Sequence, residues 1–233
     1  MAEAGRDVKE TVGARYPAPA MLERFRQFWT DVWAPLGNLL LRLGVSPNAV
    51  TLVGTLGVCA GALVFFPQGW LLAGVLVITA FVFSDMIDGY MARASGQTSP
   101  FGAFLDSTLD RIGDAAVFGG IALYYVGPGD SEWKAALALY CLAMGSVTSY
   151  ARARAESLGM QAKVGIAERS DRLVSILGMT GLADLLRHLG VDDGVLWLIP
   201  ITLAVLAVAS TVTVVQRILV VRKQSLALPP PTE

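Results

Sequence analysis

The chain has 233 residues, of which 54% are hydrophobic and 16% are charged, and its formal net charge is -1. Its mean hydropathy of +0.56 is too high for a soluble domain, and its apolar residues are grouped in long blocks. The composition therefore predicts an integral membrane protein, and the small net charge gives no indication of a nucleic-acid partner.

Residues 1–20 are polar, and we expect them to form a cytoplasmic tail. Between residues 21 and 44, apolar side chains recur at helical spacing while Arg24, Gln27 and Asp31 occupy the opposite face. This pattern predicts an amphipathic helix that lies in the membrane interface and is interrupted at Pro35.

Six apolar segments follow, each long enough to cross a hydrocarbon core of about 30 Å as a helix. They cover residues 49–66, 70–91, 104–126, 133–153, 171–188 and 195–219. The fifth is short and contains Asp184, so a fold of four or five spans stays possible if this segment lies on the surface. We expect an all-α membrane fold with six transmembrane helices over residues 45–223 and a tail over 224–233. Gly57 and Gly61 form a G-x-x-x-G in the first span, which we interpret as tight packing inside the bundle.

The positive residues predict how the spans are oriented. Of the 18 lysines and arginines, only Lys134 and Arg187 fall on the side opposite the termini. The positive-inside rule therefore predicts a multi-pass protein of the cell (plasma) membrane with both termini in the cytoplasm. The single histidine, His188, falls on the other side, which argues against a histidine nucleophile or a histidine metal site at the cytoplasmic face.

Two pairs of aspartates lie at this predicted cytoplasmic face. Asp85 and Asp88 end the second span, and Asp106 and Asp110 begin the third. Because residues three or four apart share one face of a helix, each pair projects in one direction. Four carboxylates near hydrocarbon would repel one another unless cations neutralised them. Hard divalent metals take carboxylate oxygens, so the pattern predicts a site for two Mg²⁺ or Mn²⁺ ions that leaves room for a phosphate.

From Asp85 to Asp110 the sequence reads D-x2-D-G-x2-A-R-x8-G-x3-D-x3-D. This resembles the signature of the CDP-alcohol phosphotransferases, six-span membrane enzymes that transfer a phosphoryl-linked group from a CDP-linked donor to an alcohol and release CMP. The resemblance implies that all four aspartates ligate the metals and that Asp110 also takes the proton from the acceptor hydroxyl. It further implies a homodimer, which is the usual oligomeric state in the family, embedded among membrane lipids.

The same resemblance implies a set of contacts to the donor, CDP-diacylglycerol. These would come from Gly89, Ala92, Arg93 and Gly102, and from Asn48 and Thr51 at the start of the first span. For the segment Pro47-Asn48, ordinary capping of a helix N-terminus is an alternative explanation.

The loop between the fourth and fifth spans carries more cations than a neutral acceptor such as serine or inositol would need. The candidate acceptor residues are Arg152, Arg154, Lys163, Arg169 and Arg172, joined by Arg217 at the inner end of the last span. Residues 150–156 and 168–172 resemble the actinobacterial branch of the family, which uses inositol phosphate. We therefore expect inositol 3-phosphate as the acceptor, although the same cations would also satisfy the positive-inside rule alone.

Two alternatives stay open. A phosphatidylglycerophosphate synthase would use glycerol 3-phosphate, which is also anionic. A membrane ion or proton transporter could line its path with these aspartates, but they gather near one face, and the fourth to sixth spans offer few carboxylates to continue such a path.

Overall fold

A computed structural model describes residues 32–96 and 99–227, except for the side chain of Asp85. The predicted tail at 1–20, most of the interfacial helix at 21–44 and the last residues of the C-terminal tail lie outside this range. The part of the interfacial helix that is described, residues 32–42, is helical.

Each of the six expected segments is helical. The elements are α2 (Pro47–Ala60), a π-helical turn (Gly61–Phe65), a 3-10 turn (Phe66–Gln68), α3 (Leu71–Val82), α4 (Ser84–Ala94), α5 (Pro100–Val126), α6 (Glu132–Ser157), α7 (Arg169–His188), a 3-10 turn (Asp193–Trp197) and α8 (Leu198–Leu226). Three stretches are long and apolar enough to cross a membrane on length and composition alone, namely Pro47–Gln68, Leu71–Ala94 and Asp193–Leu226. The all-helical prediction is therefore confirmed for the described residues.

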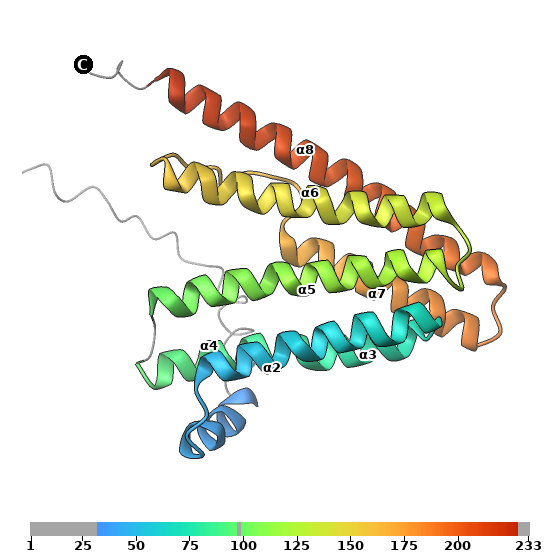
Figure 1. Cartoon of the computed structure of the whole chain (residues 1–233), viewed down its shortest axis with the longest axis horizontal. Coiled ribbons are helices and arrows are strands. Elements are labelled where there is room, and N and C mark those ends of the chain that lie inside the picture. The colour runs from blue at the N-terminus through green and yellow to red at the C-terminus, as the bar shows by residue number, and fades with distance from the viewer. Residues whose placement is uncertain (1–31, 97–98, 228–233) are drawn as a thin grey trace, which may run out of the picture.

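The helices run side by side along the long axis of the molecule (Figure 1). α5 packs against α2 and α6, α6 packs against α8, and α3 packs against α7. Because successive segments alternate in direction, α4, α6 and α8 end where α2 and α5 begin. We call this end of the bundle the aspartate end, since it holds Asp88, Asp106 and Asp110. Large side chains that are almost fully buried form the core between the ends: Phe66, Phe118, Ile121, Ile176, Ile199 and Leu203.

Glycines allow α2 to lie close against α3. A Cβ atom at Gly57 would overlap the ring of Phe81, and one at Gly61 would lie 2.8 Å from the side chain of Ile78. The G-x-x-x-G therefore packs inside the bundle, as predicted.

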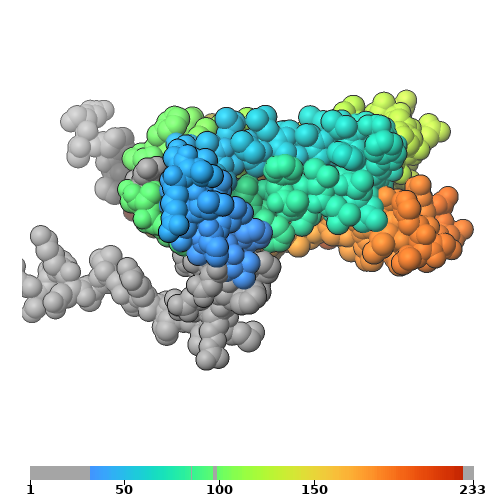
Figure 2. Space-filling view, turned by 90° about the horizontal axis from the view of Figure 1, so that it is seen from below, coloured from blue at the N-terminus to red at the C-terminus, as the bar shows by residue number. Residues whose placement is uncertain are grey.

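The segment that precedes α2 covers α4 at the aspartate end. Figure 2 shows this segment lying beside α4 across one end of the surface. The hydroxyl of Tyr90 donates to Asn38 Oδ1 at 3.1 Å, and the rings of Trp33 and Phe83 lie 5.7 Å apart. These contacts fix the position of α4, which carries one of the two aspartate pairs.

Candidate active site

A cavity of about 280 Å³ lies between α2, α4 and α5 at the aspartate end. We call it the donor cavity. Its lining residues are Pro47, Asn48, Thr51, Asp88, Gly89, Ala92, Ser99, Gly102, Ala103 and Asp106. The fold thus brings two predicted metal ligands together with all the predicted donor contacts except Arg93.

Both α2 and α5 begin beside this cavity, and each has a serine cap followed by proline. The amide of Ala49 donates to Ser46 Oγ at 3.2 Å, and the amide of Gly102 donates to Ser99 Oγ at 3.0 Å. Helix N-termini attract anions, so two of them beside one cavity favour a phosphate-bearing ligand. Because Ser46 caps α2, the capping explanation is not required for Asn48, whose side chain lines the cavity.

Thr51 fixes the orientation of Asp88. The Thr51 hydroxyl donates to Asp88 Oδ2 at 2.6 Å, and it also lies 3.1 Å from the carbonyl of Pro47. Both side chains belong to buried residues, Asp88 being 8% exposed. Thr51, for which the sequence predicts a donor contact, lines the donor cavity and also holds Asp88, a predicted metal ligand.

Small residues keep the donor cavity open. A Cβ atom at Gly102 would lie 3.5 Å from Asn48 Oδ1, inside the space that the cavity occupies. Arg93 is exposed and does not line the cavity, although its Nη1 atom lies 3.5 Å from the position of a Cβ atom on Gly89.

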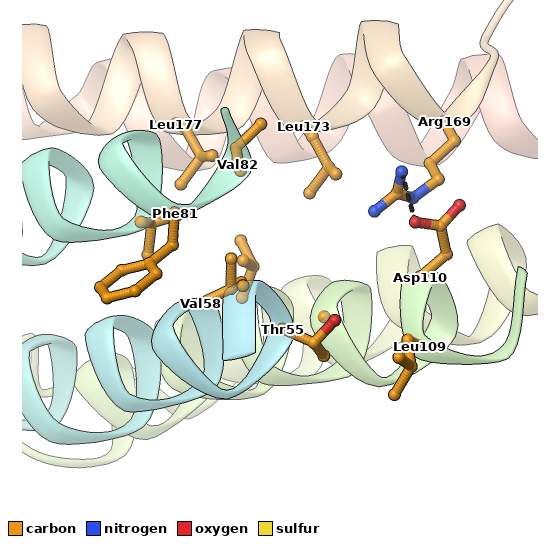
Figure 3. Close-up of a pocket in the computed structure, with 13 residues that line it drawn as sticks. Thr55, Val58, Phe81, Val82, Leu109, Asp110, Arg169, Leu173 and Leu177 are labelled. Atoms are coloured by element: carbon orange, nitrogen blue, oxygen red, sulfur yellow. Dashed lines mark ion pairs between the residues drawn. The ribbon is translucent and has the colours of Figure 1, made fainter. Parts of the chain in front are cut away.

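Asp110 lies one turn beyond Asp106 on α5 and lines two other cavities instead of the donor cavity. Its Oδ1 atom lies 2.8 Å from Arg169 Nη1, and its Oδ2 atom lies 3.7 Å from Arg111 Nη2. Figure 3 shows Asp110 and Arg169 pointing toward each other at one end of a small, mostly apolar cavity. Asp110 is therefore held between hydrocarbon-like side chains and a guanidinium group.

A second cavity, of about 800 Å³, lies between α5, α6, α7 and α8 and is also lined by Asp110. We call it the acceptor cavity. Its charged lining residues are Asp110, Arg111, Arg152, Glu156, Glu168, Arg169, Arg172 and Arg217, and its hydroxyl-bearing ones include Ser107, Thr148, Ser149, Tyr150 and Ser170. Four of the six predicted acceptor residues, from α6, α7 and α8, thus converge beside Asp110.

Two of these arginines are almost completely buried. Arg217 Nε donates to the carbonyl of Val164 at 2.9 Å, and its Nη1 donates to the carbonyl of Thr148 at 2.5 Å. The side chain of Arg172 is 2% exposed and donates from Nη1 to the carbonyl of Ala167 at 3.3 Å. Its Nη2 atom has no hydrogen-bond acceptor among the described residues. Because guanidinium groups keep their charge when buried, a cavity lined by two of them is suited to an anionic ligand.

The other two predicted acceptor residues lie elsewhere. Arg154 and Lys163 are exposed and line neither cavity, and Arg154 Nη1 lies 3.3 Å from Ser157 Oγ. Arg152 lines the acceptor cavity, and two residues further along a helix corresponds to about half a turn, so Arg154 faces away.

Two further charged residues of this site, Arg111 and Asp114, were not predicted from the sequence. Arg111 directly follows Asp110, and its Nη1 atom donates to Ser149 Oγ on α6 and lies 3.3 Å from Asp114. Asp114 continues the four-residue spacing of Asp106 and Asp110 along α5. That spacing, carried one step past the motif, was the pattern that could have revealed it.

The acidic residues suit a hard divalent cation. Among the side chains that the structure describes, which exclude Asp85, no three acidic, cysteine or histidine groups gather closely enough to hold a metal ion. Asp88 and Asp106 nevertheless share the donor cavity, and they offer only oxygen donors, which Mg²⁺ and Mn²⁺ prefer.

Both the sequence and the helical fold of this chain match known proteins. Residues 44–229 match the family model of the CDP-alcohol phosphatidyltransferases, and the chain belongs to this family. It is similar to a phosphatidylinositol phosphate synthase of Streptomyces avermitilis, with 50% identity over 227 residues that cover 97% of this chain and 90% of the relative. A phosphatidylinositol phosphate synthase of Cutibacterium acnes is 49% identical over 87% of this chain and 98% of its own length.

Solved structures of a Mycobacterium tuberculosis phosphatidylinositol phosphate synthase share the fold. The structure with CDP-DAG bound has a TM-score of 0.75 and 39% identity, and it covers 82% of this chain and 94% of its own. The structure in complex with manganese and citrate has a TM-score of 0.73 and 39% identity, with coverage of 81% and 88%.

Proposed function

We propose that this protein is a phosphatidylinositol phosphate synthase. It transfers the phosphatidyl group of CDP-diacylglycerol to a hydroxyl of inositol 3-phosphate and releases CMP. The observation that carries the proposal is the acceptor cavity, which five arginines line together with the Asp110 carboxylate. A neutral acceptor would leave the positive charge of these arginines without a counter-charge from the ligand, whereas a phosphate would supply one and form charge-assisted hydrogen bonds. The names of the similar actinobacterial proteins support the same acceptor.

In this proposal the donor cavity binds the donor and the acceptor cavity binds the acceptor, and α5 contributes residues to both. Asp106 lines the donor cavity and Asp110 lines the acceptor cavity, and four residues along a helix correspond to about 6 Å of rise. In this arrangement the diphosphate of the donor lies at the N-termini of α2 and α5, while the acceptor lies among the arginines. The short separation lets the acceptor hydroxyl reach the donor phosphorus past the side of α5.

Asp88 and Asp106, together with Asp85 and Asp110, would hold two divalent metal ions, which neutralise charge on the diphosphate oxygens when bound. The manganese in the structure of the mycobacterial relative supports a divalent metal. Thr51 orients Asp88 for this role through its hydroxyl.

Asp110 is the proposed base. The acceptor oxygen forms a bond to the phosphorus that carries diacylglycerol, the bond from that phosphorus to the bridging oxygen breaks, and CMP leaves with that oxygen. The hydroxyl proton passes to the Asp110 carboxylate. Arg169, whose Nη1 atom lies 2.8 Å from Asp110 Oδ1, restricts the orientation of this carboxylate.

We further propose that the chain crosses the plasma membrane six times and acts as a homodimer. The aspartate end then lies in the cytoplasm, where inositol phosphate is available. The cations gathered at that end support this orientation.

The deciding experiment measures CMP release from CDP-diacylglycerol by the purified protein with Mg²⁺ or Mn²⁺. Inositol 3-phosphate, glycerol 3-phosphate, inositol and serine are supplied in parallel, and we expect activity with inositol 3-phosphate far above the others. A preference for glycerol 3-phosphate would instead identify a phosphatidylglycerophosphate synthase. Full activity in excess EDTA would contradict the role of the metals.

A further inference from the structure

Asp114 is a buried carboxylate that the proposed reaction does not use. It lies one turn beyond Asp110 on α5, its side chain is 9% exposed, and it does not line the acceptor cavity. Burial of a carboxylate is costly unless cations and hydrogen bonds compensate for the lost hydration. The position of Asp114 is therefore explained by what surrounds it.

Three arginines that line the acceptor cavity converge on this one carboxylate. Arg169 Nε donates to Asp114 Oδ1 at 3.0 Å, Arg111 Nη1 lies 3.3 Å from Oδ2, and Arg172 Nη2 lies 3.8 Å from Oδ2. These contacts lie outside the acceptor cavity, because the three arginines line the cavity and Asp114 does not. Asp114 can therefore influence a ligand in the cavity only through the guanidinium groups.

Without Asp114, the arginine cluster would lack its shared counter-charge. Guanidinium groups packed together repel one another, and long arginine side chains lose rotamer freedom when they are held in one arrangement. A carboxylate between them offsets the repulsion and fixes their directions before the ligand arrives. Asp114 also gives Arg169 a second acidic partner, so that this arginine does not depend on Asp110 alone.

We propose that Asp114 is a positioning residue for the acceptor. It holds Arg111, Arg169 and Arg172 in place for the acceptor's phosphate, and so contributes to the choice of a phosphorylated over an unphosphorylated alcohol. This inference rests on the proposed function, because it takes the acceptor to be anionic.

The test begins with the isosteric change Asp114→Asn in the full-length protein. We expect the KM for inositol 3-phosphate to rise by about 10- to 100-fold, since a buried charge pair loses one partner, while the KM for CDP-diacylglycerol changes by less than about twofold. Stabilisation of the protein against heat by inositol 3-phosphate, measured without donor, should fall in parallel. Equal effects on both substrates, or no effect on the acceptor, would overturn the proposal.

Asp184→Asn is the matched control. Asp184 is a buried carboxylate on α7 that lies 3.7 Å from Arg187, but it lines neither the donor nor the acceptor cavity. Its substitution should leave both KM values unchanged. An equal rise in acceptor KM in this variant would show that loss of any buried carboxylate loosens the bundle, and would overturn a specific role for Asp114.

A double-mutant cycle with Arg172→Gln separates positioning from direct contact. If Asp114 acts through the arginines, the combined effect of both changes on the acceptor KM should be smaller than the product of the two single effects, whereas effects that multiply fully would contradict this. Should Asp114→Asn fail to fold, Asp114→Glu replaces it, and its longer side chain should raise the acceptor KM selectively. A KM that is unchanged or raised for both substrates would overturn the proposal. If the unmutated protein releases no CMP with inositol 3-phosphate, the proposed function itself fails, independently of Asp114.

Discussion

Asp106 and Asp110 are one turn apart on the same helix, yet they line different cavities. Asp106 is exposed in the donor cavity, where the acidic oxygens gather, while Asp110 is paired with Arg169 on the acceptor side. Asp106 and Asp110 are therefore expected to have different roles, Asp106 as a metal ligand and Asp110 chiefly as the base. The environment of each carboxylate, and not its residue type, assigns the role.

We predict that Asp110→Asn lowers turnover by about 10²- to 10⁴-fold, the usual contribution of a general base, while the KM for CDP-diacylglycerol changes little. Steady-state CMP release at saturating metal tests this. The comparison variant is Asp106→Asn, which should instead raise the metal concentration needed for half-maximal activity. Near-normal turnover in Asp110→Asn would require another base.

A second prediction concerns Thr51. Thr51→Val keeps the shape of the side chain but removes the hydroxyl that donates to Asp88, so we expect the metal requirement to rise by about 10- to 100-fold, as for other residues that orient metal ligands. Thr51→Ser should restore most of the affinity. Thr55→Val, one turn further along α2, is the control, because within the described part of the chain the Thr55 hydroxyl bonds only the carbonyl of Thr51. A metal titration in which all three variants behave alike would contradict this role.

At the scale of helices, α2 and α3 approach closely only because glycine occupies the contact. We predict that Gly57→Ala destabilises the bundle by about 1–3 kcal/mol, since its Cβ atom would overlap the Phe81 ring. Gly119→Ala is the control. Among the described residues no heavy atom lies within 4 Å of its added Cβ, and alanine favours the helix by about 0.5–1 kcal/mol. Denaturation midpoints in detergent should separate the variants, and equal midpoints would contradict the packing argument.

The positions of the helices were largely predictable from sequence. Apolar runs mark helices because a buried backbone must satisfy its own hydrogen bonds, and Pro47 and Pro100 with their serine caps begin α2 and α5. The segment at 171–188, which seemed short for a span, is a 20-residue helix from Arg169 to His188. This helix begins with a capping box, in which the Asp171 carboxylate accepts from the amide of Glu168 at 3.1 Å.

The site was predictable only where local spacing determines it. The spacing of the motif aspartates predicted that each pair shares one face of its helix, and the family resemblance named the donor contacts that line the donor cavity with Asp88 and Asp106. The acceptor cavity depends on contacts across the bundle, such as Arg169 with Asp110 and Arg217 with Thr148, which no local pattern encodes. For the same reason, Arg154 was grouped with Arg152 although the two face different ways.

At the scale of the whole molecule, the two ends differ in charge and in aromatic content. At the end opposite the aspartates, Lys134 Nζ lies 4.4 Å from the centre of the Trp197 ring and 5.6 Å from that of Trp133. Arg187 pairs there with Asp184 and Asp193. Tryptophan is typical of the membrane interface, and both cations are already engaged within the protein. This pattern supports an outer face that is anchored in lipid headgroups.

This asymmetry leads to a prediction about topology. With Cys59 and Cys141 replaced by alanine, a single cysteine at Glu132→Cys should react with a membrane-impermeant maleimide in intact cells, because Glu132 is exposed at the start of α6, at the end opposite the aspartates. A cysteine at Gln161→Cys, exposed in the loop between α6 and α7, should react only after permeabilisation. The cysteine-free protein controls for background labelling. The reverse pattern would place the aspartate end outside the cell, away from cytosolic inositol phosphate. Reaction of both sites in intact cells would mean that α6 does not cross the membrane, and the six-span topology would then have to be abandoned.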